Sequence, residues 1–176
     1  MNRLVTPLVG ACLLTAPALA QETPKPGPEH ARLGYFAGTW RFEGEAKASP
    51  MGPAGKLSGT DTCEWFAGGF HLVCRGDGTG PRGAHTGASI WGYDAMQQHY
   101  TYFGHNSLGD GFYVLGNLAG SVWTWNTEFP VEGGTVRARV ILTEQSPTAY
   151  TYRFEMSPDG TNWTVVEEGR ATKRGR

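Results

Sequence analysis

The sequence predicts an all-β domain, namely an antiparallel up-and-down β-barrel of about eight to ten strands with a short N-terminal helix. Apolar and polar residues alternate over strand-length segments, and 26 glycines and 12% aromatic residues are typical of many short strands joined by turns. The predicted connections are hairpin-sized, and no helical segment is long enough to cross between parallel strands. Closing the sheet would remove its edge strands, which favours a barrel, although a β-sandwich fits the same periodicity.

Residues 1–20 have the three parts of a secretory signal peptide. Arg3 supplies a positive start, an apolar run follows, and Ala18-Leu19-Ala20 forms a small-x-small cleavage site before Gln21. A lipoprotein signal at Cys12 is the alternative placement of the same export signal. We therefore expect a periplasmic or secreted protein.

The rest of the chain has the length of one domain. Residues 21–28 carry the prolines of an extended linker, and residues 29–176 are predicted to form the barrel. Removing residues 1–20 takes away Arg3 and no acid, so the formal net charge goes from −1 to −2. A charge so near zero argues against nucleic acid as a partner, and no later stretch is apolar enough for a membrane-spanning helix. The oligomeric state is left open.

The elements can be placed in chain order. Residues 28–36 predict a short helix, because proline suits the first turn and Leu33 and Phe36 lie one turn apart, and this helix would plug one end of the barrel. The first strand places Trp40 and Phe42 on one face and charged residues on the other. Glycine-rich residues 77–83 predict a loop. The ten strands are expected at residues 38–46, 56–67, 70–76, 84–93, 99–105, 112–115, 121–128, 135–143, 150–156 and 161–173.

Cys63 and Cys74 remain after the signal is removed, and an even pair in an exported protein predicts a disulfide. A two-residue turn at Gly68-Gly69 would place Cys63 directly opposite Cys74. That register makes them a hydrogen-bonded pair, whose Cα spacing of about 5.5 Å a disulfide can still span. Two reduced, buried cysteines are the alternative.

Four stretches resemble the lipocalin-like barrels of domain of unknown function 1579, in that family's order: LGYFAGTW at 33–40, WFAGGF at 65–70, WGYD at 91–94 and SPDGTNW at 157–163. The resemblance implies a calycin-type antiparallel barrel, commonly exported in bacteria, with no established activity or catalytic residues. In lipocalins a basic residue of the last strand packs across the tryptophan of the first. The resemblance therefore implies barrel closure by Gly38 and Trp40, with Arg170 or Lys173 stacked on Trp40.

No pattern of residues predicts catalysis. The five histidines lack the spacing of metal ligands, and the last strands contain no histidine that could serve as an axial haem ligand, so we expect no metal or cofactor. Glu64 and His71 share one face of the Gly-Gly hairpin and could form an acid–base pair if that face pointed inward. The opposite face carries Trp65 and Leu72, which predicts that Glu64 and His71 face solvent.

The aromatic residues are the remaining enrichment, and they either fill the core or line a cavity. We predict an exported barrel that binds a small apolar or aromatic ligand. The alternative is a non-enzymatic structural or interaction module of the cell envelope with a solid core, and an enzyme using Glu64 and His71 ranks third. The residues predicted to form the pocket or its floor are Trp40, Phe42, Trp65, Trp123 and Tyr152.

Overall fold

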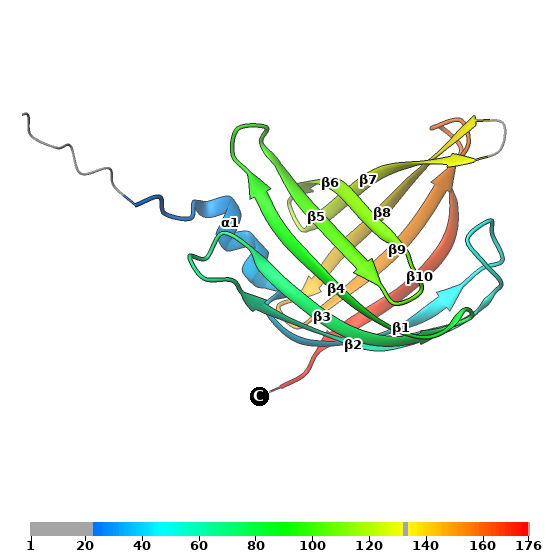
Figure 1. The fold of residues 1–176 in the computed structure, drawn as a ribbon, viewed down its shortest axis with the longest axis horizontal. Helices are drawn as coiled ribbons and strands as arrows, with labels where there is room; N and C mark the ends of the chain where they lie inside the picture. The colour runs from blue at the N-terminus through cyan, green and yellow to red at the C-terminus, as the bar shows by residue number, and fades with distance from the viewer. Residues whose placement is uncertain (1–22, 132–133, 176) are drawn as a thin grey trace, which may run out of the picture.

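The computed structural model describes residues 23–131 and 134–175 as a closed ten-stranded antiparallel barrel with a short helix at one end (Figure 1). Every strand pairs with its neighbours in sequence, and β1 pairs with β10 to close the barrel. The predicted up-and-down barrel is confirmed. The elements are α1 (Pro28–Leu33), the 3₁₀ turn η1 (Gly34–Phe36), β1 (Gly38–Ala46), β2 (Gly55–Trp65), β3 (Leu72–Gly80), β4 (Gly83–Asp94), β5 (His99–Asn106), β6 (Gly111–Ala119), β7 (Val122–Val131), β8 (Gly134–Ser146), β9 (Ala149–Ser157) and β10 (Thr164–Lys173).

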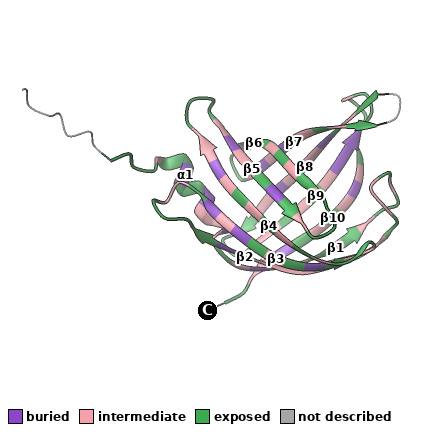
Figure 2. Ribbon diagram, in the orientation of Figure 1, coloured by how far each residue is buried: buried purple, intermediate pink, exposed green. Residues whose placement is uncertain are grey.

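Burial alternates along the strands, as expected for a barrel with one wet and one dry face (Figure 2). In β1, Trp40 is buried and Phe42 is partly buried, whereas Arg41, Glu43 and Glu45 are exposed. The predicted signal peptide and its cleavage site at Ala20 and Gln21 lie outside the described residues. Among the residues described, no helix is long and apolar enough to cross a bilayer.

Two segments continue as strands beyond the predicted ends, and one of them, at residues 77–80, was predicted as a glycine-rich loop. Residues 77–80 continue β3, so only two residues separate it from β4, and β6 runs on to Ala119. In β3 the inward glycine Gly76 leaves space for the Asp61 carboxylate, and in β6 Gly116 leaves space for the Trp125 ring. The prediction of a loop at 77–80 was wrong because glycine was interpreted as a turn signal, whereas here it accommodates a side chain of the neighbouring strand.

The N-terminal helix and η1 seal one end of the barrel, as predicted. Leu33 and Phe36 are 0% and 2% exposed, and the Trp40 indole donates a 2.8 Å hydrogen bond to the Phe36 carbonyl. The Phe36 ring contacts Trp91 and Trp123, with ring centroids 4.8 and 5.1 Å apart. We call this end the floor and the opposite end, where the β1–β2 and β3–β4 connections lie, the mouth.

Lys173 is the basic residue of the last strand that packs on the floor tryptophan. Its ammonium lies 5.1 Å from the centroid of the Trp40 ring and donates to the Tyr35 carbonyl at 3.2 Å. Arg170, the other candidate, is exposed and pairs with Glu43 in the strand register. The contact therefore joins the last strand, the first strand and the helical plug.

The predicted disulfide joins Cys63 and Cys74, which are directly opposite in the β2–β3 register. The turn between them is longer than predicted: the Phe66 amide donates to the His71 carbonyl, which leaves four residues in the loop. Hydrogen-bonded and non-hydrogen-bonded pairs alternate along an antiparallel ladder, so this makes Cys63 and Cys74 a non-hydrogen-bonded pair. Their Cα atoms are 4.0 Å apart, and the prediction of a hydrogen-bonded pair was wrong.

Replacing both cysteines (Cys63→Ser with Cys74→Ser) should lower the free energy of unfolding by about 2–3 kcal/mol, because an unfolded chain without the cross-link gains conformational freedom. Urea denaturation followed by tryptophan fluorescence measures the change. Wild-type protein in reductant should behave as the double variant does. Equal midpoints for oxidised wild type and the variant would contradict the prediction.

Lys173→Met should lower the free energy of unfolding by about 1–2 kcal/mol, because it removes both the cation over Trp40 and the donor to the Tyr35 carbonyl. Arg170→Met is the matched control, and it should change stability by less than about 0.5 kcal/mol because the side chain is exposed. Chemical denaturation of the two variants in parallel makes the comparison. A larger loss of unfolding free energy for Arg170→Met than for Lys173→Met would contradict the assignment of Lys173 to the floor contact.

Candidate ligand-binding site

The barrel interior is hollow. A main cavity of about 490 Å³ extends inward from the mouth, and an adjoining lobe of about 220 Å³, here called the floor lobe, reaches Phe36, Trp40 and the disulfide. The two share eight lining residues and so form one continuous space. The aromatic side chains that line the main cavity are Phe42, Trp91, Tyr102, Phe112, Trp125, Phe129, Tyr150, Tyr152 and Phe154.

The large aromatic residues leave this space because their rings lie against glycines of neighbouring strands. A Cβ atom on Gly59 would lie 2.4 Å from the Phe42 ring, and one on Gly169 would lie 2.6 Å from the Tyr152 hydroxyl oxygen. Real Cβ atoms cannot approach so closely, so each ring occupies a position that only a glycine neighbour permits. The rings therefore cover the barrel wall instead of crossing the lumen.

The five predicted pocket or floor residues fall in three places. Phe42 and Tyr152 line the main cavity, and Trp40 lines the floor lobe. Trp123 is fully buried, where it packs on Phe36 and donates to Glu144 at 2.8 Å. Trp65 lies outside the cavity: it ends β2, is 41% exposed, and sits 3.4 Å from the position of a Cβ on Gly34 in η1. Trp65 is on the inward face of β2, as the alternation predicts, but it lies past the floor end of the barrel.

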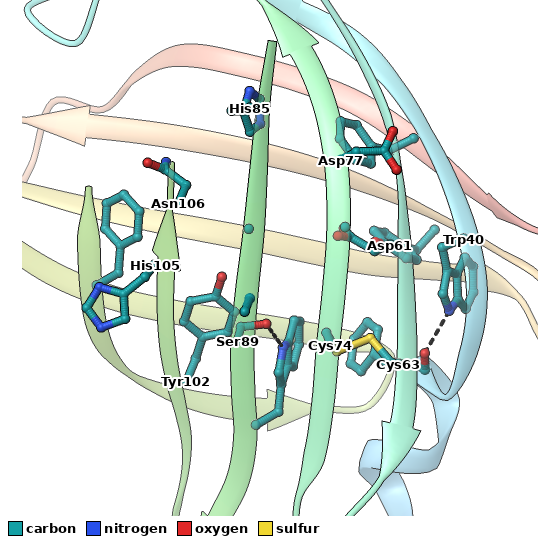
Figure 3. Close-up of a pocket in the computed structure, with 18 residues that line it drawn as sticks. Trp40, Asp61, Cys63, Cys74, Asp77, His85, Ser89, Tyr102, His105 and Asn106 are labelled. Carbon is teal, nitrogen blue, oxygen red and sulfur yellow. Dashed lines mark hydrogen bonds between the residues drawn. A yellow bond between two sulfur atoms is a disulfide. The ribbon is translucent and has the colours of Figure 1, made fainter. Parts of the chain in front are cut away.

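Asp61 is the main polar residue that the sequence reasoning missed. It is paired with Trp40 on β1 and Gly76 on β3. It lines the floor lobe, as Figure 3 shows, and also the main cavity. Burial raises the pKa of its carboxyl group, and the negative charge of Asp77 raises this pKa further, while His85 acts in the opposite direction. The alternation signal was present, because Asp61 lies two residues before the inward Cys63.

Two more ionisable residues face the cavity. His85 on β4 lines both parts of it, and its Nδ1 atom is buried without a hydrogen-bond partner among the described residues. Glu167 on β10 lies near the mouth, where it pairs with Ala46 and Phe154 in the register, and burial raises its pKa. The wall is therefore mostly apolar, with a few polar groups that could orient a ligand.

An ion pair at the mouth fixes two turns to each other. Arg82, in the β3–β4 turn, binds Asp110, in the β5–β6 turn, and Asn106 donates to the same carboxylate at 2.8 Å. The hydrogen bond from Arg82 is the main cause that lowers the pKa of Asp110. The two charges of this pair balance each other.

Glu64 and His71 do not face the cavity. Both are exposed on the outer surface beside the β2–β3 turn, and neither lines either part of the cavity. Within residues 23–131 and 134–175, no three His, Cys, Asp or Glu side chains gather closely enough to hold a metal ion. The acid and the histidine that line both parts of the cavity are instead Asp61 and His85.

The family model described as protein of unknown function (DUF1579) matches residues 25–173, and no curated protein sequence matches this chain. The crystal structure of Rv2717c from M. tuberculosis is similar, with a TM-score of 0.58 and 11% identity over 85% of this chain and 99% of that one. At these levels the likeness shows the barrel fold alone.

Two further solved structures are more distant. A de novo designed fluorescence-activating β-barrel has a TM-score of 0.45 and 16% identity, over 80% of this chain and 95% of that one. EF1p2_mFAP2b bound to DFHBI has a TM-score of 0.43 and 12% identity, over 82% and 98%. Neither likeness carries a conclusion about this chain.

Asp61→Asn should raise the melting temperature at pH 7. The folded-state pKa of Asp61 is raised, so the folded protein holds this proton more tightly than the unfolded chain does, and stability falls as pH rises from about 4 through the folded pKa. The ionised carboxylate is thus destabilising at neutral pH, and a neutral side chain of the same shape removes that cost.

Thermal unfolding of both proteins between pH 7 and pH 4 measures this effect, and the advantage of the variant should shrink toward the acid end. Glu45→Gln, on the exposed face of β1, removes the same charge without the burial and should leave the melting temperature nearly unchanged. A variant less stable than wild type at pH 7 would contradict the prediction.

Proposed function

Since the chain belongs to the DUF1579 family of proteins of unknown function, we propose its role from its own site: it is an exported, lipocalin-like barrel that binds a small, mostly apolar or aromatic molecule. The observation that carries the proposal is the main cavity of about 490 Å³ with its aromatic lining. That volume lies within the range of small-molecule sites, about 300–1,000 Å³.

Binding would occur by burial in a largely pre-formed cup. The floor is sealed by Phe36 and Trp40, so the ligand enters at the mouth and loses water as it moves inward. The rings held against glycines keep the cup open without a ligand, which reduces the reorganisation that binding requires. Asp61 and His85 would orient a polar group of the ligand, and the role is non-catalytic.

The export part of the proposal rests on residues 1–20, which lie outside the described residues. The Cys63–Cys74 disulfide supports it, because such bonds persist mainly in oxidising compartments such as the periplasm. A mature chain purified from the periplasm should begin at Gln21, and its intact mass measures this directly.

One observation favours the alternative of an interaction module. Ile90, Phe103 and Tyr113 are aligned across β4, β5 and β6 on the outer face, and they are 46%, 46% and 61% exposed. An apolar row on an outer surface is typical of a site for protein contact. The hollow interior weighs against the solid core that this alternative assumed.

Filling the cavity should abolish binding of the apolar dye N-phenyl-1-naphthylamine. Val114 on β6 lines the main cavity, and Val114→Trp should weaken dye binding at least about tenfold by occupying that volume. Leu115→Trp is the matched control, because the adjacent side chain is exposed on the outer face, and it should bind as wild type does. Dye fluorescence titration gives the affinities, and near-UV circular dichroism checks that each variant is folded.

Native mass spectrometry of protein taken gently from its own periplasm would identify the ligand. Mass above that of the disulfide-bonded chain, lost on denaturation, supports the proposal. A bare chain that also fails to bind the dye would contradict it, and a complex with another protein would favour the interaction module.

A further inference from the structure

We propose that the floor lobe selects ligands that carry a protonated amine, and that Asp61 is the specificity-determining residue that recognises it. This inference rests on the ligand-binding role proposed above and names the chemical class of the ligand. It starts from the charges that face the cavity.

The cavity has an excess of negative charge that no described cation neutralises. Of the basic side chains along it, Arg82 is bound to Asp110, and Lys47 is bound to Glu168 at 3.2 Å. Asp61 makes no ion pair or side-chain hydrogen bond within the described residues. Lys173, the basic group on the floor, is directed to the Tyr35 carbonyl and lies on the other side of β1 from Asp61.

Asp61 is partly buried, and it lines the cavity from β2. A Cβ on Gly76 would lie 1.9 Å from its Oδ1 atom, so the carboxylate rests over the β3 backbone where any other residue would displace it. The register places it level with Trp40, at the floor end of the lumen and remote from the mouth. A carboxylate that is partly removed from water and has no protein donor gains from a donor that a ligand supplies.

The surroundings of Asp61 suit a cation with an apolar body. Phe42, Trp91, Tyr102, Phe112 and Tyr150 line the same lobe, and aromatic rings attract cations while excluding water. In this environment an ammonium group can donate to Asp61 while its hydrocarbon part fills the main cavity. A carboxylate ligand would instead be repelled by both Asp61 and Glu167.

The titratable groups that face Asp61 set how recognition responds to pH. They are His85 on β4, Tyr102 on β5 and Tyr150 on β9, while Asp77, exposed on the outer face of β3, acts on Asp61 through its charge. Burial raises the pKa of both tyrosines, so they stay neutral at neutral pH. On acidification Asp61 gains a proton and loses its negative charge, so amine affinity should fall as pH falls.

A charge series on one ring system tests the proposal: 1-naphthylmethylamine, 1-naphthalenemethanol and 1-naphthoic acid, titrated by calorimetry at pH 7. Wild type should bind the amine about tenfold or more tighter than the alcohol, and the acid most weakly. Asp61→Asn should remove the amine advantage and leave the alcohol affinity within about twofold. Glu45→Gln, which removes an equal charge from the outer face, should keep the advantage.

The outcomes separate the two proposals. If the probes bind but the amine has no advantage, or keeps it in Asp61→Asn, the Asp61 inference is overturned and ligand binding stands. If Glu167→Gln removes the advantage and Asp61→Asn does not, the recognising charge is at the mouth and the inference is likewise overturned. If no probe and no dye binds folded wild type, the cavity role itself fails. A decrease in the amine advantage as pH is lowered from 7, with the alcohol unaffected, supports the inference.

Discussion

The contact between inward aromatic rings and the glycines of adjacent strands determines the shape of this barrel's interior. Phe42 lies over Gly59, and Tyr152 lies over Gly44 and Gly169. Because the glycine has no Cβ atom, the ring can lie against its backbone. The bulky residues therefore cover the wall, and a cavity remains. The same arrangement helps to explain why a chain rich in glycine forms long, regular strands: at Gly59, Gly116 and Gly169 a ring of a neighbouring strand fills the space of the missing side chain.

The floor depends on a second set of contacts, between elements far apart in the sequence. Phe36, Trp40 and Lys173 connect the helical plug to the first and last strands. This closes one end of the barrel and leaves the mouth as the route inward. Asp61 lies on the strand next to Trp40, so the network that closes the barrel also sets the depth at which a ligand would meet a charge.

The fold was largely predictable, and the site was only partly so. Alternation and turn signals predicted ten strands, the plug and the opposition of Cys63 to Cys74, because these depend on local pattern. The same signals misread residues 77–80, since a glycine that receives a neighbour's side chain resembles a glycine in a turn. Alternation correctly placed Trp65 on the inward face of its strand, but the residue lies past the floor end of the cavity. Asp61 was overlooked although it lies on the same face of β2 as Cys63. The position of a residue along the barrel axis depends on the register of the closed barrel, which sequence periodicity does not specify.

The pairing of Trp40 with Lys173 has a consequence for how the molecule could be held in place. Because β1 begins and β10 ends at the floor, the chain enters and leaves the barrel at the same end, beside α1 (Figure 1). A surface linkage or a fused domain attached at either end of the barrel chain would therefore be connected to the floor end of the barrel. The mouth would then lie at the end opposite the attachment, where it faces solvent and a ligand can enter or leave.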